Sequence, residues 1–253
     1  MSKILLYKAI AAIGLTSTLT LLSYGWPNHV LAQDSSQERM GIPGRRVGGG
    51  TRGPEQGFSE KPLVALVPEN NQSLTVAQTP TFFFYVPKTQ TSQMVEFVLS
   101  DENDQPIYET KFATNGDSGV IGVSLPADSK IKSLEIGKTY RWYFAIIPNS
   151  GDRTADIHVD GSIKRVNPDE TIASQLKNSD PLDRAAVYAS NNFWSDAIAI
   201  VAGLRRANPN DGAVAAKWAE LLKTLKLDNI AQEPVVEYRV STQQQPVLQS
   251  EVR

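Results

Sequence analysis

Three arginines stand close together in a glycine-rich segment near the N-terminus, and their guanidinium groups are suited to binding anions. Residues 41–57 read GIPGRRVGGGTRGPEQG and contain seven of the 17 glycines, a single acid, and Arg45, Arg46 and Arg52. A guanidinium can hold a carboxylate, a phosphate or an anionic glycan through paired hydrogen bonds. We expect either a slack arm, which is the usual role of glycine-rich segments, or an arm that docks on an anion or a partner.

The same segment does not have the pattern of a nucleotide-binding loop. Such a loop follows a strand, precedes a helix and reads GxxxxGK[ST] or GxGxxG. Here no strand is expected before the segment, no helix is expected after it, and the segment contains no lysine. The sequence therefore argues against nucleotide binding.

His158 is a second candidate, because it lies between two acids at alternate positions, Asp156 and Asp160. Alternate residues of a strand point to the same side, so this triplet could chelate a divalent ion. The solvent-facing side of an antiparallel strand is also routinely polar. We therefore expect a solvated strand face and no metal site. The acidic cluster at 101–104 lacks the glycine and spacing of an EF-hand loop, and we expect a solvated turn there.

Exposed aromatic side chains could complete a binding surface, because they stack on sugars and anchor protein partners. Tyr143 is expected to point outward beside Arg141, and Trp194 lies near the start of an expected helix. The residues predicted to form the contact surface are Arg45, Arg46, Arg52, Tyr143 and Trp194. Trp194 could instead pack between helices, and the apolar stretch 82–85 could be covered by them. The sequence identifies no catalytic residue and no cofactor.

The N-terminus has the pattern of a leader for export. Two lysines precede the 14-residue apolar run 9–22, and Val30-Leu31-Ala32 ends in small or modest side chains suited to signal peptidase. A membrane-spanning helix needs roughly 20 apolar residues, so we expect cleavage before Gln33 and no transmembrane anchor. Loss of the two lysines changes the formal charge from −2 to −4, which argues against nucleic acid as a partner. The chain has no cysteine, so disulfides and thiolate chemistry are excluded.

These candidate residues must be positioned by the elements that follow the arm. Apolar and aromatic runs alternate with turn residues in a way typical of an antiparallel β-sandwich. The seven strands expected lie at 63–67, 81–86, 94–99, 107–112, 120–125, 139–147 and 155–166. The spacing of Leu134, Gly137 and Tyr140 resembles the tyrosine corner of immunoglobulin-like sandwiches, in which a tyrosine hydroxyl returns to the backbone upstream. These three residues are predicted to be structural.

A helical pattern begins after Asn167, which is the expected N-cap, with Pro168 expected at the first helical position. Asp180-Pro181 repeats this pattern of a capping residue followed by proline. The spacing resembles about one and a half tetratricopeptide repeats, and the residues that carry it are Tyr188, Ala197, Val201, Leu204 and Pro209. The predicted fold is all-β plus α, an immunoglobulin-like sandwich followed by a short tetratricopeptide-like segment. The expected divisions are a signal peptide (1–32), a Gly/Arg-rich arm (33–61), a sandwich (62–166), helices (167–232) and a flexible tail (233–253).

An ordered set of segments resembles a known family. The set includes GRRVGGGTRG, LVALVPE, TFFFYVP, GKTYRWYF, DRTADIHVDGSIKRV and LDRAAVYASNNFWSDAI. It is similar to an exported cyanobacterial family that is known as a domain of unknown function, number 928. The resemblance covers about residues 41–234 and implies a location and a shared architecture, but no activity and no catalytic residues.

The function expected from these observations is non-catalytic binding or scaffolding in the periplasm, the cell envelope or the extracellular space, after export by the general secretory route. The expected partner is an envelope protein or an anionic glycan, and the oligomeric state is left open. A carbohydrate-binding module for envelope or extracellular polysaccharide is one alternative, and an enzyme of unrecognised type is another. A concave groove with two coplanar exposed aromatics would favour the first, and a deep pocket with several acids or His158 would favour the second.

Overall fold

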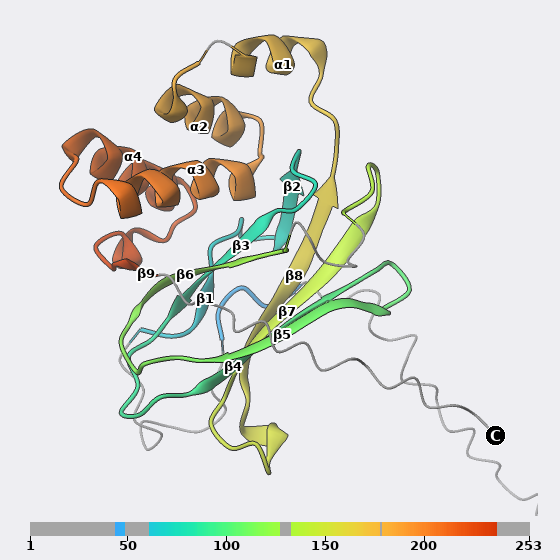
Figure 1. The fold of residues 1–253 in the computed structure, drawn as a ribbon, viewed down its shortest axis with the longest axis vertical. Helices are drawn as coiled ribbons and strands as arrows, with labels where there is room; N and C mark the ends of the chain where they lie inside the picture. The colour runs from blue at the N-terminus through green and yellow to red at the C-terminus, as the bar shows by residue number, and fades with distance from the viewer. Residues whose placement is uncertain (1–43, 49–60, 127–132, 178, 237–253) are drawn as a thin grey trace, which may run out of the picture. The chain divides into compact units, whose positions relative to one another are not determined.

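The computed structural model describes residues 44–48, 61–126, 133–177 and 179–236. In this part of the chain two sheets of mainly antiparallel strands are followed by four helices (Figure 1). The strands are β1 (Val64–Ala65), β2 (Gln72–Thr75), β3 (Thr81–Val86), β4 (Met94–Ser100), β5 (Pro106–Ala113), β6 (Gly119–Ser124), β7 (Thr139–Ile147), β8 (Ile157–Arg165) and β9 (Val235–Val236). The helices are α1 (Glu170–Lys177), α2 (Pro181–Ser190), α3 (Trp194–Ala207) and α4 (Gly212–Thr224), with short 3₁₀ turns η3 (Arg153–Ala155) and η4 (Asp228–Ile230).

The strands divide into a four-stranded and a five-stranded sheet. The four-stranded sheet has the order β1-β3-β6-β9, and the five-stranded sheet has the order β2-β8-β7-β4-β5. Two pairs are parallel, β2 with β8 and β6 with β9, and the other pairs are antiparallel. The chain crosses between the two sheets several times along the sequence.

One hydrophobic core lies between the two sheets. In β7 the residues Tyr140, Trp142, Phe144 and Ile146 are buried on one side, as the alternating pattern predicts. The ring of Phe144 stacks on that of Phe84 from the other sheet, with centroids 4.1 Å apart. Trp142 fits because its neighbour on β8 is Gly161, where a Cβ atom would lie 2.4 Å from the indole.

The tyrosine near the start of β7 fixes the turn that precedes this strand. The backbone N–H of Glu135 donates a 2.9 Å hydrogen bond to the hydroxyl of Tyr140. Gly137 adopts a φ of +84°, and its N–H donates to the carbonyl of Arg165 at 2.7 Å. Leu134 is fully buried, and its carbonyl accepts from the Arg165 guanidinium at 2.6 Å. These contacts have the direction expected of a tyrosine corner.

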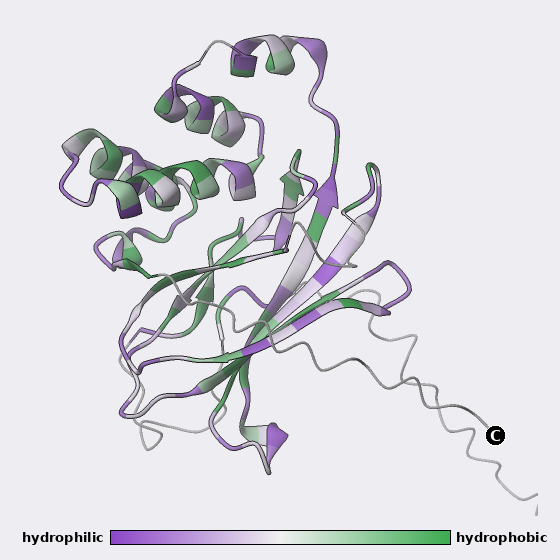
Figure 2. Cartoon of the chain, viewed as in Figure 1, coloured by the Kyte–Doolittle hydropathy of each residue, from purple (hydrophilic) through white to green (hydrophobic). Residues whose placement is uncertain are grey.

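The helices cover the outer face of the four-stranded sheet. A second core contains Phe83, Tyr85 and Val120 from this face together with Val201 and Trp218 from the helices. This packing explains why β3 is apolar on both sides, whereas most strands alternate (Figure 2). At the edge of this contact, the Asp196 carboxylate near the start of α3 accepts hydrogen bonds from the Thr75 hydroxyl at 3.2 Å and the Val76 N–H at 3.3 Å.

The structure corrects several expected boundaries. Strands β2 and β9 were not expected, and β9 lies inside the segment interpreted as a flexible tail. Glu233 begins that ordered segment by accepting from Lys61 at 2.5 Å and from Ser118 at 3.0 Å. The first helix begins at Glu170, and Asp169 caps it by accepting from the Ile172 N–H at 2.8 Å, so the expected cap at Asn167 was wrong. Residues 1–43 and 237–253, which include the expected leader, lie outside the described residues.

Candidate binding face of the five-stranded sheet

The outer face of the five-stranded sheet carries polar and aromatic side chains across neighbouring strands. Register places Glu96 of β4 beside Lys111 of β5 on one side and beside Ala145 of β7 on the other. Ala145 is in turn opposite His158 of β8, and Tyr143 is opposite Asp160. We call this surface, defined by Glu96, Lys111, Tyr143, His158 and Asp160 with the adjoining Arg153 and Asp156, the polar face.

At the centre of the polar face, two rings lie against each other. The rings of Tyr143 and His158 have centroids 5.1 Å apart and an interplanar angle of 30°, and both side chains are partly exposed. Burial lowers the pKa of His158 below its ordinary value, and the nearby Arg45 lowers it further against the effects of Asp160 and Asp156. Burial also raises the pKa of Tyr143, so both rings are neutral at pH 7. A neutral aromatic surface of this kind suits the apolar side of a sugar ring.

An ion-pair network fixes one side of the polar face. Glu96 is only 7% exposed, and its carboxylate contacts Lys111 Nζ at 2.7 Å and Arg153 at 2.5 Å. Arg153 also contacts Asp156 at 2.6 Å. Burial alone would raise the pKa of Glu96, but the two cations outweigh burial and hold this pKa below its usual value. The same carboxylates raise the pKa of Arg153, so the network is charged at neutral pH.

On the opposite side, the Gly/Arg-rich segment lies against β8. The carbonyl of Arg45 accepts a 2.9 Å hydrogen bond from the Asp160 N–H, and the Arg45 N–H donates to the Asp160 carboxylate at 3.2 Å. Gly44 permits this approach, because a Cβ atom there would lie 2.5 Å from the Asp160 carbonyl oxygen. The side chain of Arg45 is exposed, and its charge is near enough to His158 to lower the pKa of that ring.

Arg46 has a different position, and its predicted place in a contact surface does not fit its burial. It is 9% exposed, and its guanidinium donates to the carbonyl of Leu225, the C-cap residue that follows α4. Burial lowers the pKa of Arg46, and Glu69 partly opposes this change. On either side, Ala65 N–H donates to the Arg46 carbonyl at 2.9 Å, and Gly48 N–H donates to Leu63 at 2.8 Å. Residues 44–48 are therefore a structural clasp between the sheets and the helices.

The remaining predicted binding residues do not join the polar face. Trp194 is 8% exposed and belongs to the core between the helices and the four-stranded sheet, so the structure corrects its predicted place on a contact surface. Arg52 lies outside the described residues. Glu96 and Arg153 were missed by sequence reasoning. Their place on the polar face depends on the pairing of β4 with β7 and on the turn η3. Neither feature can be predicted from a local sequence pattern.

The acidic cluster at 101–104 forms a turn, as expected. The Asp101 carboxylate accepts from the N–H groups of Asn103 at 2.9 Å and Gln105 at 3.0 Å. Asp104 adopts a φ of +60° and pairs with Arg141 at 2.9 Å. Within the described residues, no group of three His, Cys, Asp or Glu side chains is arranged to hold a metal ion.

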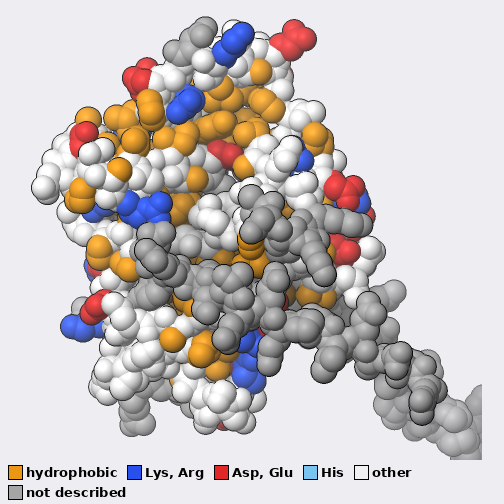
Figure 3. Space-filling model, in the orientation of Figure 1, with side chains coloured by type: hydrophobic (Ala, Val, Ile, Leu, Met, Phe, Trp, Pro, Cys, Tyr) orange, Lys and Arg blue, Asp and Glu red, His pale blue; other side chains and the backbone are white. Residues whose placement is uncertain are grey.

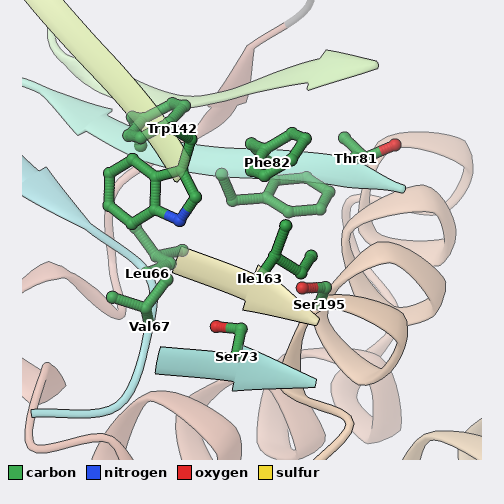
Figure 4. A pocket seen from close by; sticks show the side chains of 10 residues that line it. Leu66, Val67, Ser73, Thr81, Phe82, Trp142, Ile163 and Ser195 are labelled. Atoms are coloured by element: carbon green, nitrogen blue, oxygen red, sulfur yellow. The ribbon is translucent and has the colours of Figure 1, made fainter. Parts of the chain in front are cut away.

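A small cavity lies between the sheets and the helices rather than on the polar face (Figure 4). It is lined by Ser73, Phe82, Trp142, Ile163 and Ser195, among others, and its volume of about 10 Å³ leaves room for about one water molecule. The Ser73 hydroxyl and the Trp142 indole N–H are buried with no hydrogen-bond partner among the described residues. The cavity is too small for a ligand larger than water.

The surface over the helices differs from the polar face. On the side shown in Figure 3, hydrophobic side chains gather over the helical segment, with charged side chains scattered singly among them. Leu182, Tyr188 and Leu204 are partly buried and pack against the core between the helices and the four-stranded sheet. Among the helices that the structure describes, none has the length and apolar character needed to cross a membrane.

Comparisons with known proteins add one finding. Residues 47–235 match a protein family described as Domain of Unknown Function (DUF928). No curated protein matches the sequence of this chain. The matched region begins within the clasp and ends in β9, so it covers both sheets and all four helices.

Proposed function

The chain belongs to the DUF928 family, and we propose that it is a non-catalytic binding protein of the cell envelope that recognises an acidic polysaccharide on the polar face. The observation that carries the proposal is the stack of Tyr143 on His158, which presents neutral ring surface on an open sheet. The exposed Arg45 side chain, whose charge acts on His158, supplies an unburied cation for a sugar carboxylate. An envelope protein is the other partner class that such a surface could take.

The side chains of the polar face are held in place, which supports a role in ligand binding. The Glu96 network joins β4, β5 and the turn η3, and the pairing of Arg45 with Asp160 joins the clasp to β8. Side chains held in place lose less conformational entropy when a ligand binds. The stacked rings are therefore preorganised between two fixed borders.

We also propose a specific architecture for the two sheets and for the helices. We take the two sheets to be an immunoglobulin-like sandwich, supported by the Tyr140 hydroxyl bonded to the backbone upstream. We take the helices to be tetratricopeptide-like, supported by the successive packing of α2 on α3 and α3 on α4. Both architectures commonly present recognition surfaces, although an architecture alone assigns no ligand.

Export completes the proposal. Support comes from the sequence of residues 1–32, in which two lysines precede an apolar run and small residues precede Gln33. The expected route is the general secretory pathway, with the mature protein in the periplasm, the envelope or the extracellular space. Mass spectrometry of the protein from an envelope fraction should find Gln33 at the N-terminus. Intact chains beginning at Met1 in the cytosol would contradict this part of the proposal.

The binding role is tested by titrating the protein with a polysaccharide rich in uronic acids and, as a control, with a neutral polysaccharide. We expect heat of binding for the acidic polymer in isothermal titration calorimetry, weakening as salt is added. Tyr143→Ala should abolish binding, whereas Tyr143→Phe should retain most of it because the ring remains. Equal binding by wild type and Tyr143→Ala, or no binding by wild type, would overturn the proposal.

A further inference from the structure

Strand β5 lies at one edge of the five-stranded sheet with its far side unpaired in the described part of the chain. In that part β5 pairs with β4 and with no other strand, although it is eight residues long. The side chains of Glu109 and Lys111 are 43% and 47% exposed. A long open edge strand offers backbone N–H and C=O groups for pairing with another chain.

The register with β4 shows which backbone groups face outward. The N–H of Thr114 donates to the carbonyl of Gln93 at 2.8 Å, continuing the pairing of Met94 with Ala113. In an antiparallel pair, the residues that bond to the partner alternate along the strand. The even-numbered residues of β5 therefore bond toward β4, and the odd-numbered residues Glu109, Lys111 and Ala113 turn their N–H and C=O groups to the open edge.

The sequence of this edge is complementary to itself. In the stretch IYETKFA (107–113), a twofold axis at Thr110 places Glu109 opposite Lys111 of a second copy, and Lys111 opposite Glu109. Tyr108 then lies opposite Phe112 on the other side of the sheet. The outward-facing residues Glu109 and Lys111 fall in the hydrogen-bonded positions of this pairing, so side-chain charge and backbone geometry agree on one register.

Other registers are disfavoured by the same charges. A shift of two residues in either direction places Glu109 opposite Glu109 or Lys111 opposite Lys111. A parallel arrangement in register sets like charges side by side as well. Charges on an edge strand usually discourage pairing, but here their alternating signs favour the antiparallel register centred on Thr110 over its two neighbouring registers and over the parallel one.

We propose that two copies of this protein associate through antiparallel pairing of β5 with β5 about a twofold axis at Thr110, which joins their five-stranded sheets into one. The interface is isologous, because the same strand serves both copies. The Tyr143 and His158 rings lie on β7 and β8, which are separated from β5 by β4, so pairing leaves them accessible in both copies. The dimer then presents two polar faces on one sheet, and a long polymer can bind both.

Sedimentation velocity over about a hundredfold range of concentration tests this association. Wild type should show a monomer–dimer equilibrium. Glu109→Lys and Lys111→Glu should each weaken the dimer by about tenfold or more, because both twofold-related pairs become repulsive. A mixture of the two variants should restore association as a heterodimer, since one chain then carries lysine at both positions and the other carries glutamate at both. Glu220→Lys, a matched charge change on the exposed surface of α4, should leave the equilibrium unchanged.

A cysteine test does not depend on those charge changes. The chain has no cysteine, so Thr110→Cys introduces a single thiol at the twofold axis. Mild oxidation should give a disulfide-linked dimer, because Thr110 faces its own copy in a position without direct backbone bonds, where the two Cα atoms are about 4.5 Å apart. Ser124→Cys on β6 is the control and should not crosslink at the same rate. A monomeric wild type, a dimer that neither charge variant weakens, or failure of the mixed variants to associate would overturn the proposal.

Discussion

The two sheets of this protein use their outer faces in opposite ways. The outer face of the four-stranded sheet is sealed by helices, and Tyr85 on it is 1% exposed. In the described part of the chain no helix covers the outer face of the five-stranded sheet, and Tyr143 on it stacks on His158 with both side chains partly exposed. The same residue type thus serves as core on one sheet and as a candidate ligand contact on the other. The helices, rather than the strands, decide which face remains available.

The largest expected effect comes from removing a ring on the sealed side. Tyr85→Ala should lower the free energy of unfolding by about 3–5 kcal/mol, because it leaves a cavity between the sheet and the helices. Urea titration followed by circular dichroism measures this loss. A loss below about 1 kcal/mol would show that the helices do not seal this face.

The next effect concerns the clasp that connects the two regions. Arg46→Ala should cost about 1–3 kcal/mol, because the Leu225 carbonyl at the end of α4 loses its buried donor. Arg45→Ala is the matched control on the neighbouring residue, whose side chain is exposed, and it should change stability by less than about 0.5 kcal/mol. Equal effects of the two substitutions in urea titration would mean that residues 44–48 do not join the helices to the sheets.

A buried acid makes the contact between the helices and the sheets dependent on pH. Burial near the start of α3 raises the pKa of Asp196 to about 6 from an ordinary value of 3.8, against hydrogen bonds from Thr75 and Val76. The folded state therefore holds this proton more tightly than the unfolded chain does. The resulting stabilisation is complete below about pH 4 and is lost as pH rises through about 6, for a total of about 1–3 kcal/mol.

Asp196→Asn isolates that contribution. Urea titrations at several pH values between 4 and 7 should show a flatter stability profile for the variant than for wild type. Tyr188 also faces Asp196, but its pKa lies above the ordinary tyrosine value and it does not titrate in this range. A variant profile that parallels the wild-type profile would assign the pH dependence to other groups.

A similar but independent loss is expected within the core that both sheets share. Tyr140→Phe should destabilise the fold by about 1–2 kcal/mol, because the Glu135 N–H loses its acceptor in a largely buried turn. Thermal and urea unfolding both measure this change. Unchanged midpoints would show that the hydroxyl does not fix the turn before β7.

The smallest expected effect on stability is on the open side. Tyr143→Ala should cost no more than about 1 kcal/mol, since the side chain is partly exposed and contributes one ring contact. The contrast with Tyr85→Ala in the same urea experiment sharpens the comparison between the two faces. Losses of similar size for the two variants would mean that both outer faces are structural.

Local patterns in the sequence predicted the strands with alternating or continuous apolar residues, and β3 and β7 begin and end where expected. Strand β2 was missed because QSLT has little apolar character and is held in place by parallel pairing with β8. Strand β9 contains only Val235 and Val236, too few residues for a periodic signal.

The candidate site was less predictable than the fold. The outward position of Tyr143 followed from alternation on β7, but its stacking on His158 depends on the pairing of β7 with β8. The burial of Arg46 could not be read from a glycine-rich segment, because its acceptor lies 179 residues away on the helical side. The alternation of apolar and polar residues predicts which side of a strand a residue faces. Tertiary contacts decide whether that side is covered.

Amide hydrogen exchange with and without an acidic polysaccharide tests the central claim most directly, that the open face of the five-stranded sheet is the recognition surface. We expect slower exchange on ligand binding in β7 and β8, around Tyr143 and His158, with little change in α2, α3 and α4. Protection confined to the helices, or absent from the whole chain at saturating polysaccharide, would contradict it.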